Sequence, residues 1–159
     1  MKATTSSIGL DKTKSEKLAK KLNTLLANYQ LFYMNTRGFH WNIKGDNFFE
    51  LHLKFEEIYN NLQLKIDEIA ERILTLGYTP LHSYTDYLKQ STIKEKTNAT
   101  NGKSSLTEVL NSLELLINLQ RDLLAMASDA NDEGTSALMS DYIREQEKLI
   151  WMFTAYLNK

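Results

Sequence analysis

The stretch from Asn47 to Leu76 contains neither proline nor glycine, and its apolar residues recur at helical intervals. A pattern of this length predicts one long helix and argues against strands. The rest of the chain agrees, because one proline and six glycines are spread over 159 residues. Few turns are therefore available, and the sequence predicts an all-α protein built from long helices.

Start and stop signals divide the chain into four long helices and a short one. A capping box from Thr13 to Glu16 opens the first, and Gly38 is expected to end it. Ser105 is expected to open the third long helix, and Gly134 to mark the turn before the fourth. The expected helices are 13–37, 47–76, a short one within 81–90, 105–129 and 135–157.

The link between the second and third long helices is itself long. Two antiparallel hairpins joined by a long crossover are the arrangement of a ferritin-like four-helix bundle. We therefore expect this all-α fold, with the short extra helix in the crossover. The chain has enough residues for one domain with a core, so 1–159 is expected to be a single domain with a flexible N-terminal tail over 1–12.

Two pairs of potential metal ligands, His52/Glu56 and Asp67/Glu71, lie on the second expected helix. Each pair has i,i+4 spacing, which places its members one turn apart on a helix face. All four fall within about a third of the helix circumference, at roughly 100° per residue. The pairs are about 15 residues apart, however, which is roughly 22 Å along the axis. Since metal–ligand bonds are about 2 Å long, one copy of this helix cannot close a site.

A second copy of the helix, running antiparallel across a two-fold axis near Leu62, would solve this problem. It would set the His52 end of one copy beside the Asp67 end of the other, and His40 lies just upstream as a fifth candidate ligand. The spacing therefore predicts a metal site shared between subunits. The alternative is that Glu71 pairs with Arg72 or Lys65 in solvent and that the histidines are packed side chains.

Composition excludes several classes of protein. There is no cysteine, so disulfides, thiolate metal sites and thiol chemistry are absent. The formal net charge of −1 gives no overall attraction for nucleic acid. No Glu-x-x-His occurs, which argues against a diiron site inside one bundle. The N-terminus lacks a signal-peptide pattern and no apolar run reaches about 18 residues, so we expect a cytoplasmic protein with no membrane segment.

The chain resembles the Dps family of DNA-binding proteins from starved cells, also called mini-ferritins. The resemblance covers nearly the whole chain in helix order and length. It is carried by the segment 35–45 (NTRGFHWNIKG), by Phe49, His52, Phe55, Glu56, Glu57 and Tyr59, and by the segment 67–72 (DEIAER).

The resemblance implies a hollow dodecamer with a ferroxidase centre at each two-fold interface. It implies His40, His52 and Glu56 as ligands from one subunit, with Asp67 and Glu71 from the partner. Glu56 stands where many members have Asp. The family oxidises Fe(II) to Fe(III), generally with hydrogen peroxide, and stores ferric mineral. Mixed imidazole and carboxylate ligands agree with iron chemistry.

Trp41 directly follows a candidate ligand. Two compatible interpretations are an aromatic residue in the subunit interface and, as in the family, a trap for stray oxidising equivalents near iron. His82 is expected to be a surface or packing residue and no ligand.

Acidic residues before the fourth long helix are candidates for the pore through which iron enters in the family: Asp129, Asp132 and Glu133. The alternative is a solvated turn with a helix N-cap. Ala137 stands where members often have Asp, so this pore is expected to be less acidic than usual.

DNA is a weakly supported partner. The segment before the first helix carries Lys2 and Lys12 only, and twelve copies would carry a charge of about −12, which phosphate repels. A nucleoid-associated DNA-compacting protein with secondary iron chemistry remains the alternative function, since many weak contacts can add up.

Overall fold

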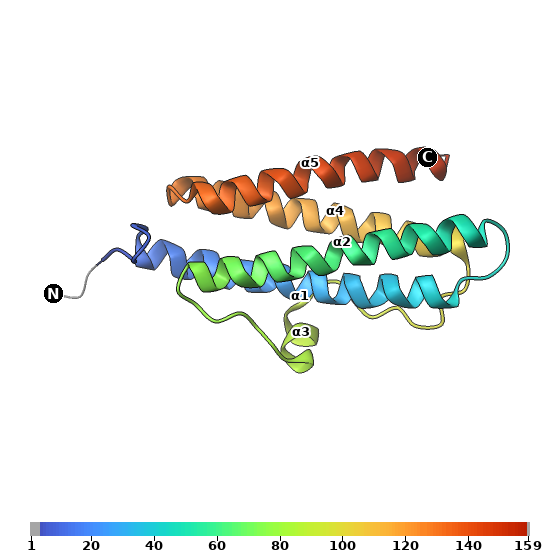
Figure 1. The fold of residues 1–159 in the computed structure, drawn as a ribbon, viewed down its shortest axis with the longest axis horizontal. Helices are drawn as coiled ribbons and strands as arrows, with labels where there is room; N and C mark the ends of the chain where they lie inside the picture. The colour runs from blue at the N-terminus through green and yellow to red at the C-terminus, as the bar shows by residue number, and fades with distance from the viewer. Residues whose placement is uncertain (1–3, 159) are drawn as a thin grey trace.

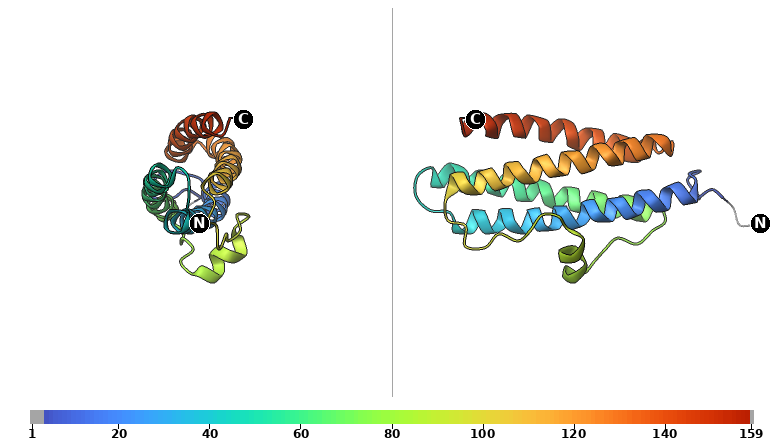
Figure 2. Two further views of the ribbon diagram at one scale, coloured as in Figure 1. Left: turned by 90° about the vertical axis from the view of Figure 1, so that its right-hand side faces the viewer. Right: turned by 180° about the vertical axis from the view of Figure 1, so that it is seen from behind.

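The computed structural model describes residues 4–158 and contains five helices over that range. Figure 1 shows two long hairpins, α1 with α2 and α4 with α5, joined by a crossover that carries α3. The end-on view in Figure 2 shows the four long helices surrounding a common interior, with α3 outside the bundle. The helices are α1 (Lys12–Asn42), α2 (Phe48–Thr75), α3 (Tyr84–Gln90), α4 (Gly102–Asp129) and α5 (Glu133–Tyr156).

This architecture confirms the expected all-α, ferritin-like bundle with a short helix in its crossover. Within residues 4–158 there is no strand, only two isolated bridges. The apolar stripes of the long helices meet in one core, and burial of large apolar side chains is the main favourable term in folding. Its largest fully buried members include Tyr29, Phe32, Phe39, Phe55, Leu62 and Ile69.

The first helix is longer than the sequence predicts at its C-terminal end. Gly38 lies inside α1, where the Nδ2 of Asn42 donates to its carbonyl oxygen at 2.8 Å. The turn comes later, at Gly45 and Asn47, which both have positive φ angles of 88° and 61°. The expectation that the first helix ends at Gly38 is therefore wrong, and His40 lies in the last turn of α1.

Three helix starts also differ from those expected. Asp11 caps α1 by accepting from the Lys14 N–H at 2.8 Å, so the Thr13 capping box is not used. Asn101 caps α4, which begins three residues before Ser105. Asp132 caps α5, and Gly134 lies within its first turn. In each case an Asp or Asn stood upstream of the residue predicted, and these are equally good N-caps.

The end of α2 follows the sequence closely. Gly77 has a φ of 92°, a left-handed conformation that glycine adopts without steric cost. Its N–H donates to the Leu74 carbonyl at 2.8 Å, and the Tyr78 N–H donates to the Ile73 carbonyl at 3.1 Å. These two bonds form a Schellman motif, which satisfies the last carbonyls of the helix.

The crossover is tied to α1 by two buried asparagines. Asn28 accepts through Oδ1 from the N–H groups of Thr92 and Ile93, each at 3.0 Å. Asn35 donates to the Lys94 carbonyl and accepts from the Lys96 N–H, each at 2.9 Å. The crossover therefore has a defined path along α1 without being a strand.

The segment before α1 is folded where the structure describes it. Thr5 and Asp11 form an antiparallel bridge, and the Ser6 N–H donates to the Leu10 carbonyl at 2.8 Å. The expected flexible tail over 1–12 stays a prediction: residues 4–11 make these local contacts, Lys12 begins α1, and residues 1–3 lie outside the described range. Over that range, none of the helices combines the length and apolar character that a membrane crossing requires.

Candidate metal centre

His40 and His52 meet where the end of α1 turns back into the start of α2. Their imidazole rings stack with centroids 3.7 Å apart and an interplanar angle of 18°. The Nδ1 of His40 lies 2.7 Å from the His52 carbonyl oxygen, and the Nδ1 of His52 lies 2.8 Å from the His40 carbonyl oxygen. The two residues therefore hold each other reciprocally.

These contacts decide which nitrogen carries hydrogen in each ring. A carbonyl oxygen can only accept, so each Nδ1 must donate to form its hydrogen bond. In a neutral imidazole the lone pair is then on Nε2, the atom able to bind a metal. A ligating histidine commonly donates its other ring N–H to such a carbonyl. Both histidines are thus prepared to act as ligands.

Aromatic side chains surround the pair. Phe48 stacks on His52 with centroids 5.1 Å apart, and Tyr59 meets His40 edge-on at 5.4 Å. Trp41 is 56% exposed, and the Arg37 guanidinium lies 4.9 Å from its ring centroid. The two histidines and Trp41 were predicted from the sequence, and Tyr59 was named only among the residues that carry the family resemblance. Phe48 and Tyr33 were missed as members of this cluster. Their approach depends on how α1 meets α2, which no local pattern encodes.

The remaining candidate ligands also lie on α2. Glu56 is half-buried, whereas Asp67 and Glu71 are exposed. Among the residues that the structure describes, no three His, Asp or Glu side chains come together in a way that could hold a metal ion. A single copy therefore provides two histidines at one end of α2 and two acids farther along it.

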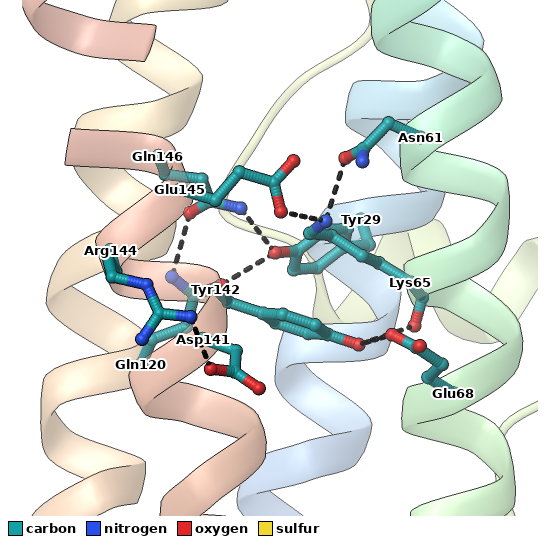
Figure 3. Close-up of polar contacts among 10 residues, drawn as sticks. All are labelled: Tyr29, Asn61, Lys65, Glu68, Gln120, Asp141, Tyr142, Arg144, Glu145 and Gln146. Carbon is teal, nitrogen blue, oxygen red and sulfur yellow. Dashed lines mark hydrogen bonds and ion pairs between the residues drawn. The ribbon is translucent and has the colours of Figure 1, made fainter. Parts of the chain in front are cut away.

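A neutral hydrogen-bonded triangle fills the middle of the bundle (Figure 3). The Tyr29 hydroxyl donates to Gln120 Oε1 at 2.6 Å and accepts from Gln146 Nε2 at 2.6 Å. Gln120 Nε2 in turn donates to Gln146 Oε1 at 2.8 Å. Burial raises the pKa of the Tyr29 hydroxyl far above its usual value, so it stays neutral. The sequence analysis did not single out these residues.

Polar contacts also connect α2 to α5 beside that triangle (Figure 3). Lys65 is 5% exposed, and its ammonium donates to Glu145 at 2.6 Å and to Asn61 at 2.9 Å. Tyr142 donates to Glu68 at 2.5 Å, and both burial and that carboxylate raise the Tyr142 pKa. Neutral glutamine amides are weak ligands for iron, and the Lys65 ammonium repels a cation. The interior therefore does not suit a diiron site.

The candidate pore residues have different environments. Asp132 is 1% exposed and is paired with Arg72 at 2.5 Å, so it does not fit the expected role of lining a pore. Asp129 and Glu133 are exposed, and Lys14 lies 3.2 Å from the Asp129 carboxylate. His82 is exposed, with Nδ1 2.9 Å from the Pro80 carbonyl oxygen.

Comparisons with known proteins agree with the fold. Residues 19–159 match the Ferritin-like domain family. A Dps protein from Vibrio cholerae O1, described as a member of a broad superfamily of ferritin-like diiron-carboxylate proteins, superposes with a TM-score of 0.96 at 61% identity over 99% of each chain. A Dps protein from Bacillus brevis gives a TM-score of 0.88 at 33% identity, covering 91% of this chain and 97% of its own.

A DNA protection during starvation protein from Porphyromonas gingivalis is 41% identical over 95% of each chain. The chain therefore belongs to the Dps family within the ferritin-like superfamily. The resemblance inferred from the sequence motifs is confirmed, and so is the link to the iron-related chemistry of this superfamily.

Proposed function

We propose that this protein is a ferroxidase and iron-storage shell whose metal sites are shared between subunits. His40, His52 and Glu56 of one subunit bind iron together with Asp67 and Glu71 of the partner subunit. The subunits assemble into a hollow dodecamer that stores ferric mineral. The observation that carries the proposal is the reciprocal histidine pair, which uses both Nδ1 atoms and leaves Nε2 as the metal-binding nitrogen of each ring. Among residues 4–158 of the same chain, no third ligand converges on the pair.

Charge supports metal binding at such an interface. Glu56, Asp67 and Glu71 would bring three carboxylates into one partly enclosed space. Like charges at short range disfavour the fully ionised state, and a bound cation offsets this repulsion. Metal binding and subunit association should therefore stabilise each other. Imidazole and carboxylate ligands suit iron in both oxidation states.

The proposed reaction uses hydrogen peroxide as oxidant. Two Fe(II) ions each give one electron to one peroxide molecule, which takes up two protons and leaves as two water molecules. Because both electrons are delivered at one site, no hydroxyl radical need be released. Trp41 follows His40 in the chain and is exposed, so it is placed to give an electron to a stray oxidant.

Two finer points belong to the same proposal. Asp129 and Glu133 remain candidates for the iron entrance, since both are exposed at the turn between α4 and α5. DNA compaction is the second candidate function, favoured by the DNA protection names of relatives. The formal net charge of −1 argues for chemical protection over coating of the DNA.

The direct test is Fe(II) oxidation followed by absorbance after adding hydrogen peroxide without oxygen. Wild type should consume about one peroxide per two Fe(II), as the electron balance requires. A His40→Ala/His52→Ala variant should lose the fast phase, and His82→Ala serves as the matched control because His82 lies elsewhere on the surface. Equal rates for wild type and the double variant would refute the proposal.

A further inference from the structure

Each histidine of the pair packs against one aromatic ring besides its partner imidazole. Phe48 lies nearly parallel to His52, at an interplanar angle of 22°, and Tyr59 packs against His40 at 79°. The ring contacts therefore run from Phe48 to His52, from His52 to His40 and from His40 to Tyr59. Each Nδ1 is used by a carbonyl oxygen. In each neutral ring, Nε2 is then the nitrogen that can bind metal.

Tyr59 is itself held by further contacts. The Arg37 guanidinium lies 5.0 Å from its ring centroid, and Tyr33 packs against it edge-on at 6.1 Å. Arg37 also donates to the Tyr33 hydroxyl at 2.8 Å, which ties the group together. Cation–π and edge-to-face contacts of this kind are attractive and favour a defined ring geometry. Tyr59 therefore has little freedom to move away from His40.

We propose that Phe48 and Tyr59 are positioning residues that hold His40 and His52 in the metal-binding orientation before metal arrives. The inference rests on the proposed function and names the part of the chain that prepares its site. An imidazole that is free to rotate must lose that freedom when it binds metal, and this loss of conformational entropy weakens the binding. In this protein the two imidazoles lose their rotational freedom when the chain folds, before metal binds.

The two halves of the shared site are then unequal. The histidine half is enclosed and fixed in a single chain, whereas Asp67 and Glu71 are exposed side chains on an open helix face. Enclosure should therefore affect the affinity for metal more than the stability of the fold, because Phe48 is only half-buried. This difference provides the test.

The experiment measures Co²⁺ binding to the assembled protein by calorimetry, with no oxidant present. Phe48→Leu and Tyr59→Leu remove the rings, Tyr59→Phe keeps the ring, and Phe49→Leu is the matched control. Phe49 is 85% exposed and contacts Phe48 but neither histidine. Phe48→Leu and Tyr59→Leu should bind Co²⁺ about tenfold more weakly, the usual effect of losing a group that orients a ligand. Tyr59→Phe and Phe49→Leu should stay within about twofold of wild type.

Thermal midpoint and assembled mass are measured for every variant, since a purely structural role would lower the midpoint and leave the Co²⁺ affinity unchanged. Wild-type affinity in both Phe48→Leu and Tyr59→Leu would overturn the inference. If Phe48→Leu does not assemble, Tyr59→Leu against Tyr59→Phe decides, and equal affinities overturn it. If wild type and His40→Ala/His52→Ala bind Co²⁺ equally, the proposed metal site itself is wrong.

Discussion

Arg72 of α2 and Asp132 at the start of α5 form an ion pair at 2.5 Å, at the end of the bundle where α2 stops. Arg72 also donates through Nε to Thr135 Oγ1 at 2.9 Å. The guanidinium lies so close over Gly134 that a Cβ added there would be 2.7 Å from its Nη1. Gly134 therefore provides room for Arg72 and is not needed to make a turn.

Gly134→Ala should destabilise the protein by about 1–2 kcal/mol, because the methyl group displaces a guanidinium from a buried carboxylate. In an Arg72→Ala background the same change should stabilise by up to about 1 kcal/mol, since alanine is the better helix former. Urea unfolding at fixed subunit concentration measures both. If Gly134→Ala still destabilises the protein in the Arg72→Ala background, the close approach of Arg72 is not the reason for a glycine at this position.

Lys65→Ala should lower the free energy of unfolding by about 2–3 kcal/mol, because it leaves Glu145 and Asn61 without their buried donor. Glu145 is partly exposed, so water replaces some of the lost contact. Lys65→Met should cost less, since its apolar stem still fills the space. Lys20→Ala is the matched control, as Lys20 forms a solvent-exposed pair with Glu16 and its loss should leave the free energy of unfolding nearly unchanged. Equal losses of unfolding free energy in Lys65→Ala and Lys20→Ala would contradict a stabilising role for the buried Lys65 ammonium.

Stability should fall in alkaline solution. Burial raises the pKa of both Tyr29 and Tyr142 in the folded state, while unfolded tyrosines ionise at about pH 10. Their contribution is therefore complete below about pH 10 and is lost as the pH rises further, by about 1.4 kcal/mol per pH unit for each residue. Urea unfolding from about pH 9 to about pH 11 measures this slope. Tyr142→Phe should make it shallower, and an unchanged slope would count against the assignment to Tyr142.

Helix existence and type were predictable here because they rest on periodicity over long stretches. The ends of the helices were less predictable, and Gly38 is an example. A glycine after an apolar stripe usually ends a helix, but α1 continues through it to Asn42. Phe39 and His40 are buried just beyond the glycine, and this tertiary packing outweighs a local cost of about 1 kcal/mol.

The candidate metal site was predictable in part for a related reason. The i,i+4 spacing of His52/Glu56 and Asp67/Glu71 follows from helix geometry alone. The stacking of His40 on His52 does not, because it depends on the turn at Gly45 and Asn47. The enclosure by Phe48 and Tyr59 depends on the same turn. Asp132 is a residue whose predicted role failed. Its charge suggested that it lines a pore, whereas an ion pair with Arg72 holds it inside the protein.

Plasmid DNA should be protected from Fe(II) and hydrogen peroxide at a salt concentration where no mobility shift occurs. The near-neutral chain gives little attraction for phosphate, so protection should come from removing both reactants. Nicking is scored on gels for wild type and for His40→Ala/His52→Ala. Failure of the wild type under these conditions, or equal protection by the double variant, would contradict protection through chemistry at the metal site.

The central claim is that each metal site needs ligands from two subunits, and mixed assemblies of His52→Ala and Asp67→Ala subunits test it. Each variant alone has no intact site. A mixed two-fold interface holds one intact site, so random mixing should restore roughly a quarter of wild-type Fe(II) oxidation. No recovery in assemblies shown to contain both subunits would contradict the shared site.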